Sequence, residues 1–179
     1  MKKNRYIKYF FLCLLTVILT VLDQLSKYLV VNRLDLNRNY SIVKYVFSFE
    51  YLENQGIAFG ILSGKIALIN VVVIIISLLI IYFAFTLERG INNNSKLFAK
   101  FTILQVICSF LVAGASGNII DRIRLGYVVD FIKFDFMNFP TFNVADCYVT
   151  VSVALLFIMI MFFVSDEDLD YLIKHKTKN

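Results

Sequence analysis

The chain has 179 residues, of which 59% are hydrophobic, and its mean hydropathy is +0.74. Soluble domains contain roughly 45–50% apolar residues, so the composition indicates a single-domain integral membrane protein spanning residues 1–179. The net charge of +5 comes from lysines and arginines that flank the apolar segments without forming a basic groove. This distribution is typical of topology signals and excludes nucleic acid as an expected partner.

The first apolar segment runs from about residue 10 to residue 31, after a basic N-terminal stretch. It is longer than the apolar region of a signal peptide, and it contains Asp23 and Lys27, so we expect a retained membrane span. These two residues are four apart and therefore lie on one helix face near its outer end. They are either a neutralised ion pair that holds two helices together or a polar wall of an active site.

The loop after this span contains a strand pattern and a turn. From Val43 to Leu52 aromatic residues occur at alternate positions, which predicts a half-buried strand in a small sheet on the membrane surface. Asn54 and Gly56 follow within the stretch 53–60, where a second glycine, Gly60, indicates a close backbone approach. This turn motif is weak evidence by itself, because Asn and Gly are common in loops.

Two further spans are expected at about 66–87 and 101–120. The β-branched stretch 69–81 would suit a buried strand in water, but in a bilayer only a helix satisfies every backbone group within one segment. Near the outer end of the third span, Ala113 and Gly117 form a small-xxx-small pair that lets another helix come close. Four residues there share one helix face by their spacing: Gly114, Asn118, Asp121 and Arg122. A structural role and a catalytic role are both open for this face.

Two aspartates flank the short turn before the fourth span, which we expect at about 144–164. Carboxylates are costly near hydrocarbon, so Asp130 and Asp146 together indicate acid–base chemistry. Other interpretations stay open, because Asn143 could cap the fourth helix with Asp146 as its third residue. Asp130 could be a solvated loop residue, although its neighbours are apolar. Spacing does not determine whether the two carboxyls meet.

The remaining charges set an orientation, and the cysteines exclude other chemistry. Four spans place both termini on one side, and the basic N-terminus and the loop between the second and third spans predict that this side is cytoplasmic. Cys13, Cys108 and Cys147 form no C-x-x-C motif, and the only histidine, His175, lies in the charged tail. We therefore expect no metal, no cofactor and no Cys–His nucleophile.

Five blocks in order give the chain a specific resemblance to bacterial lipoprotein signal peptidase, also called signal peptidase II. The blocks are Asp23-x-x-x-Lys27, Asn54-x-Gly56-x-Ala58-Phe59-Gly60, Gly117-Asn118-x-x-Asp121-Arg122, Val128-Val129-Asp130-Phe131 and Phe142-Asn143-x-Ala145-Asp146. Small departures occur at Ala113 and Ser116, where the family commonly has Gly and Leu.

The resemblance implies a four-helix, all-α membrane fold with a small extracytoplasmic β-sheet, or cradle, between the first two helices. It implies an aspartyl endopeptidase that removes signal peptides from diacylglyceryl-modified prolipoproteins, immediately before the lipidated cysteine. Asp130 and Asp146 match the family's catalytic pair. The matching supporting or substrate-binding positions are Asp23, Lys27, Asn54, Gly56, Gly114, Asn118, Asp121, Arg122 and Asn143. The implied setting is the bacterial inner membrane, with lipid and prolipoprotein as partners, a monomeric enzyme and the active site at the outer leaflet.

Three other classes of protein fit the sequence less well. A small transporter or proton-conducting protein would also keep charges in its spans, but it should show internal repeats or broken helices at mid-membrane. Intramembrane proteases of the presenilin and prepilin-peptidase type carry Gly-x-Gly-Asp, which this chain lacks. A structural scaffold would not need so many polar blocks.

Overall fold

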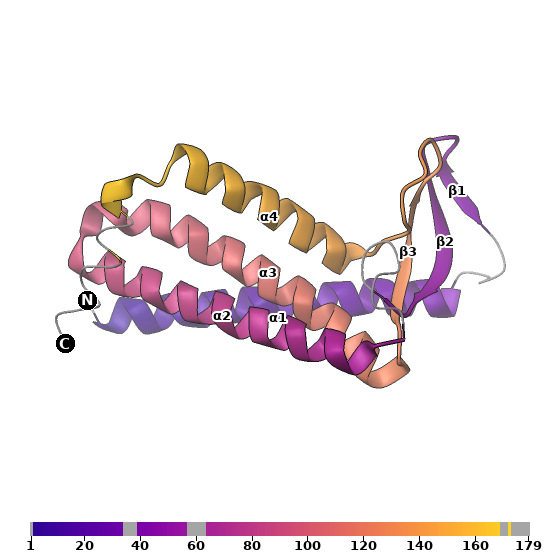
Figure 1. Ribbon diagram of the computed structural model, residues 1–179, viewed down its shortest axis with the longest axis horizontal. Coiled ribbons are helices and arrows are strands. Elements are labelled where there is room, and N and C mark those ends of the chain that lie inside the picture. The colour runs from indigo at the N-terminus through magenta and orange to yellow at the C-terminus, as the bar shows by residue number, and fades with distance from the viewer. Residues whose placement is uncertain (1, 34–38, 57–63, 169–171, 173–179) are drawn as a thin grey trace.

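The computed structural model describes residues 2–33, 39–56, 64–168 and 172. Within them, four helices are long and apolar enough to cross a membrane (Figure 1). These are α1 (Lys2–Arg33), α2 (Ile66–Asn93), α3 (Phe98–Leu125) and α4 (Val144–Phe162), with a short 3₁₀ turn, η2 (Ser95–Leu97), before α3. The predicted four-helix fold with a small sheet is confirmed. α1 to α3 extend beyond the predicted spans because polar residues continue the helical backbone outside the apolar run.

Helix α3 is the centre of the bundle. Half of its most apolar stretch is buried inside the protein, compared with 11% or less for each of the other helices. α1, α2 and α4 each pack against α3. Most large apolar side chains of the outer helices are exposed, as expected where hydrocarbon replaces water. The main core cluster comprises Leu87, Ile91, Leu97, Phe101, Leu104, Ile107 and Leu111.

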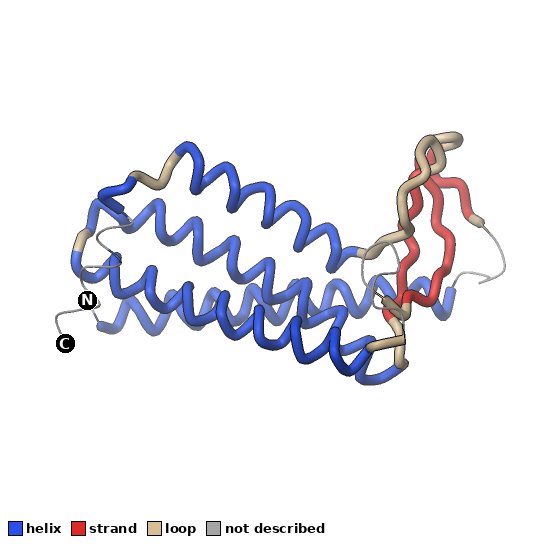
Figure 2. Tube along the Cα trace, viewed as in Figure 1, coloured by secondary structure: helices blue, strands red, loops and turns tan. Residues whose placement is uncertain are grey.

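A three-stranded antiparallel sheet covers one end of the bundle, with its strands running across the helix axes (Figure 2). Its strands are β1 (Tyr40–Val43), β2 (Phe47–Asn54) and β3 (Val128–Phe134), in the order β1-β2-β3. The N-terminus of α1 and the C-terminus of α4 lie on the opposite side of the bundle from the sheet (Figure 1). The third strand comes from the α3–α4 connection, so the sheet joins two distant loops.

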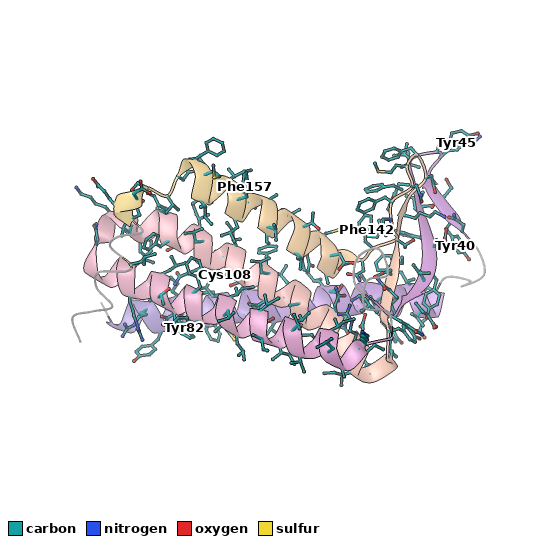
Figure 3. All side chains as sticks on the ribbon, viewed as in Figure 1. Tyr40, Tyr45, Tyr82, Cys108, Phe142 and Phe157 are labelled. Carbon is teal, nitrogen blue, oxygen red and sulfur yellow. The ribbon has the colours of Figure 1, made fainter. Side chains whose placement is uncertain are left out.

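The prediction of one strand from Val43 to Leu52 is correct from Phe47 onward, where it coincides with β2, and wrong before that residue. The chain turns at Lys44–Val46, where Val46 N–H donates to the Val43 carbonyl at 2.9 Å and Tyr45 has a φ of 65°. Tyr45 lies at the tip of the sheet (Figure 3). A bulky residue with positive φ is rare, and this turn contains none of the usual Gly, Asn or Pro signals. The aromatic alternation therefore runs through the turn of a hairpin that joins β1 to β2.

The interpretation of Asp130 as a solvated loop residue is also wrong. Asp130 lies in the middle of β3, where it pairs with Leu52 of β2, and its exposed fraction is only 1%. α3 ends just before this strand at Gly126, whose φ of 82° allows its N–H to reach the Arg122 carbonyl. The tight end of α3 brings the chain straight into the sheet.

Candidate active site

Asn143 contacts both aspartates that the sequence singled out. Its side-chain amide donates to Asp130 Oδ1 at 2.6 Å, and its backbone N–H donates to Asp146 Oδ2 at 3.2 Å. Asn143 is also the N-cap of α4, and its Oδ1 accepts from Asp146 N–H at 3.0 Å. The capping interpretation of Asp146 is therefore correct, and it does not exclude a second role. A reciprocal cap of this kind fixes the side chain against the first helical turn.

Asp130 is less exposed to solvent than Asp146. Asn54, at the end of β2, donates to Asp130 Oδ2 at 2.8 Å, while the Asn54 oxygen accepts from Gly56 N–H at 2.9 Å. Burial, followed by the nearby charge of Asp146, raises the pKa of Asp130 from its usual 3.8 to about 7. The amide hydrogen bonds from Asn54 and Asn143 oppose this rise. Asp130 therefore exchanges its proton near neutral pH.

Asn118 links the second aspartate to the helix bundle. Its amide donates to Asp146 Oδ1 at 2.8 Å, and its oxygen accepts from the Lys27 ammonium at 2.9 Å and from the Asn143 amide at 3.1 Å. Both carboxylate oxygens of Asp146 therefore have donors within hydrogen-bond distance. Asp146 is only half-buried, unlike Asp130. This difference gives the two carboxyls distinct environments, which acid–base chemistry requires.

Lys27 forms the centre of a buried charge cluster behind the aspartates. Its ammonium lies 2.9 Å from both Asp23 and Asp121, and its exposed fraction is 3%. The ion-pair interpretation of Asp23 and Lys27 is correct in geometry, and the cluster also borders the candidate site through Asn118. Asp23 in turn accepts from Ala145 N–H at 2.9 Å, in the first turn of α4. Such a cluster must be fully paired, because an unpaired buried charge is costly.

Two glycines of α3 allow this close packing. A Cβ on Gly117 would lie 2.3 Å from Asp23 Oδ2, and one on Gly114 would lie 2.6 Å from the Ala145 carbonyl. Neither space can hold an extra atom without movement. Gly117, from the predicted Ala113–Gly117 pair, therefore permits contact with α1, and Gly114 permits contact with α4.

The remaining predicted residues tie the sheet and the turn to α3. Asp121 Oδ2 accepts from Val129 N–H at 3.2 Å, and Arg122 donates to the Gly56 carbonyl at 2.9 Å. Together they hold the start of β3 and the turn after β2 on the sheet end of α3.

Sequence reasoning missed Gln24. Its amide donates to Asp121 Oδ1 at 2.8 Å and to the Gly117 carbonyl at 3.1 Å, so it completes the cluster around Lys27. The signal was available, because a polar amide next to Asp23 within an apolar span calls for a partner. Three predicted motif residues lie outside the described residues: Ala58, Phe59 and Gly60. Among the residues that the structure does describe, no group of three His, Cys, Asp or Glu could hold a metal ion.

Comparison with known proteins agrees with this arrangement. The family described as signal peptidase (SPase) II matches residues 15–162. A lipoprotein signal peptidase of Enterococcus faecalis is 40% identical over 148 residues, covering 83% of this chain and 86% of the relative. One of Halothermothrix orenii is 39% identical over 144 residues, covering 80% and 90%.

Two solved structures share the fold of this chain and about a third of its sequence. A structure described as a bacterial membrane enzyme at 2.3 Å resolution superimposes with a TM-score of 0.69 and 32% identity, covering 84% of this chain and 87% of that one. A second, at 1.9 Å, has a TM-score of 0.68 and 30% identity, covering 86% and 94%. The chain therefore belongs to the signal peptidase II family.

Proposed function

We propose that this protein is a lipoprotein signal peptidase whose catalytic groups are Asp130 and Asp146. It cleaves the signal peptide of diacylglyceryl-modified prolipoproteins immediately before the lipidated cysteine. The observation that carries the proposal is the shared hydrogen-bonding of both carboxyls to Asn143, at 2.6 and 3.2 Å. Family membership supports the reaction, and this geometry supports the choice of the two aspartates.

The two environments support a division of labour. Asp146 is half-buried at the start of α4, where the helix dipole favours a negative charge, so it acts as the base that deprotonates water. Asp130 is buried, and its pKa of about 7 lets it hold a proton at neutral pH. It therefore acts as the acid that polarises the scissile carbonyl and then protonates the leaving amine. The pair titrates jointly.

The other site residues position this pair. Asn54 and Asn143 orient Asp130, and Asn118 orients Asp146. Lys27 holds the oxygen of Asn118, which turns the Asn118 amide toward Asp146. None of these groups needs to exchange a proton. Their function is to fix the carboxyls before the substrate arrives.

The position of the site fits a substrate anchored in lipid. The aspartates lie at the sheet end of four apolar helices, so a diacylglyceryl group could remain in the bilayer while the peptide bond reaches the carboxyls. We infer that the sheet end faces the extracytoplasmic side of the bacterial inner membrane and that the enzyme acts as a monomer. Basic residues at the opposite end, including Arg5, Lys8 and Arg89, support this orientation.

The test is a cleavage assay with purified protein and lipidated precursor, read as a gel shift. Asp130→Asn and Asp146→Asn keep the side-chain size and remove proton exchange, so each should lower the rate by at least about 100-fold. The matched control is Asp166→Asn, which makes the same change at an exposed position beyond α4 and should leave the rate unchanged.

Thermal unfolding in detergent shows whether each variant is folded. A folded Asp130→Asn or Asp146→Asn protein with a near-normal rate would refute the assignment of the dyad. Failure of the wild-type protein to cut lipidated precursor would refute the substrate class.

A further inference from the structure

A groove lies between α1 and α2, in the half of the bundle away from the sheet. α1 and α2 both pack along α3, while their own backbones come close at few points, so α3 forms the floor. The cavity has a volume of about 420 Å³, and Cys108 of α3 lines it (Figure 3). Along α1 the lining runs from Tyr9 to Val17. At 1.5 Å per residue this is roughly 12 Å, which is less than half the thickness of a bilayer core of about 30 Å.

The groove presents a mostly apolar surface, because the donors of its polar side chains bond to backbone carbonyls and only the Gln105 Oε1 acceptor is left without a partner among the described residues. The Thr16 hydroxyl donates to the Leu12 carbonyl at 3.0 Å, and the Ser109 hydroxyl donates to the Gln105 carbonyl at 3.1 Å. The Gln105 amide donates to the Ala84 carbonyl at 2.9 Å. A polar solute would find few free donors here. A hydrocarbon chain fits this lining.

The mouth of the groove carries charge that the rest of it lacks. Tyr9 and Phe85 pack edge to face at 5.4 Å there, between α1 and α2. Tyr9 is within electrostatic range of Arg5, Arg89 and Glu88. Glu88 is paired with Lys8, so three cationic side chains stand against one carboxylate. α4 and the acidic residues after it do not line the groove.

We propose that this groove binds an anionic phospholipid of the leaflet opposite the sheet, with one acyl chain between α1 and α2 and its phosphate beside Arg5 and Arg89. The chain provides little selectivity, because bilayer lipid is as apolar as the groove. The preference comes from the headgroup, since each basic residue near the membrane surface contributes about 1 kcal/mol toward anionic lipid. The proposal is independent of the peptidase reaction.

The experiment is native mass spectrometry of the delipidated protein with phosphatidylglycerol or with phosphatidylcholine of the same chains. We expect phosphatidylglycerol to be retained about tenfold better. Leu12→Trp, which fills the groove, should reduce the retained phosphatidylglycerol about fivefold or more. Leu14→Trp is the matched control, because Leu14 lies on the same helix, is 40% exposed and does not line the groove.

A second variant tests the headgroup site without altering the groove. Arg5→Gln with Arg89→Gln should bring the two lipids to nearly equal retention while phosphatidylcholine retention stays as in the wild type. Arg89 is exposed and Arg5 is half-buried, and neither belongs to the hydrophobic core, so the test does not depend on core packing. Equal retention of the two lipids by the wild-type protein, equal effects of the two Trp substitutions, or an unchanged preference in the double variant would overturn the proposal.

Discussion

Asp130 and Asp146 have the same side chain but different surroundings. Asp130 has an exposed fraction of 1% and is tied to two amides, whereas Asp146 is half-buried at a helix start. Water can therefore approach Asp146 more easily than Asp130. The same Asn143 contacts both, so neither can move far without affecting the other.

The pH dependence of cleavage follows from Asp130. The proposed mechanism needs its protonated form, and the proton is lost as pH rises through its pKa of about 7. We expect kcat/KM to fall above this pH, approaching tenfold per unit. Asn54→Ala removes a hydrogen bond that favours the charged form, so this alkaline limb should move to higher pH.

The readout is the position of the limb, since loss of Asn54 also lowers the absolute rate. Asn39→Ala is the matched control, because the Asn39 amide donates to Glu50, on the sheet and not on Asp130. An alkaline limb that stays in place in Asn54→Ala, or moves equally in Asn39→Ala, would contradict the assigned role of Asp130.

At the scale of elements, α3 positions the site because its sheet end contacts α1, α4 and β3. The lack of a side chain at Gly117 leaves room for Asp23 of α1, and the lack of one at Gly114 leaves room for the first turn of α4. Asp121 then bonds the start of β3. The carboxyls come from a strand and a helix that approach the same helix from different sides, so the fit along α3 determines their alignment.

Gly114→Ala should disturb that fit. The added Cβ would lie 2.6 Å from the Ala145 carbonyl and 2.8 Å from the Val149 side chain, so α4 must shift. Overpacking of this kind costs about 1–3 kcal/mol, and we expect a lower Tm and a reduced cleavage rate. Ser116→Ala, on the same helix, is the control. The idea fails if Gly114→Ala keeps both the Tm and the rate of the wild type.

Local spacing predicted the contacts that lie within one helix. The Asp23–Lys27 pair follows from residues four apart, and the Asn143–Asp146 cap follows from a short-range pattern. The positions of the helices followed from apolar runs of sufficient length. In each case the sequence separation is short, so the geometry of one element decides the contact.

Contacts between distant elements could not be predicted in this way. The third strand, β3, pairs with β2 about 80 residues earlier, and nothing in its seven residues specifies that partner. The bridging role of Asn118 likewise depends on how α1 and α4 pack on α3. The family resemblance identified these residues, but their contacts required the structure.

At the scale of the whole molecule, the two ends of the bundle differ. One end carries the sheet and the aspartates, and the other carries the first turns of α1 and the α2–α3 connection (Figure 1). Basic residues occur at both ends, so the charge bias that sets the orientation is modest. A direct measurement of topology is therefore valuable.

Cysteine labelling measures it. Cys13, Cys108 and Cys147 are first replaced by Ser. Tyr45→Cys, at an exposed position on the tip of the sheet, should then react with an impermeant maleimide in right-side-out vesicles. Lys96→Cys, in the α2–α3 connection, should react only after the vesicles are opened. The reverse pattern would show that the inferred orientation is inverted.

The capping of α4 has a consequence for biogenesis. Asp146 lies in the first turn of the last membrane helix and Asn143 caps that helix, and the Asn143 amide also donates to Asp130. A nascent chain that has inserted only its first three helices therefore lacks one acid and leaves the other without one of its two amide donors. On the proposed mechanism, peptidase activity therefore begins only when the final helix docks, and incomplete chains are inactive during synthesis.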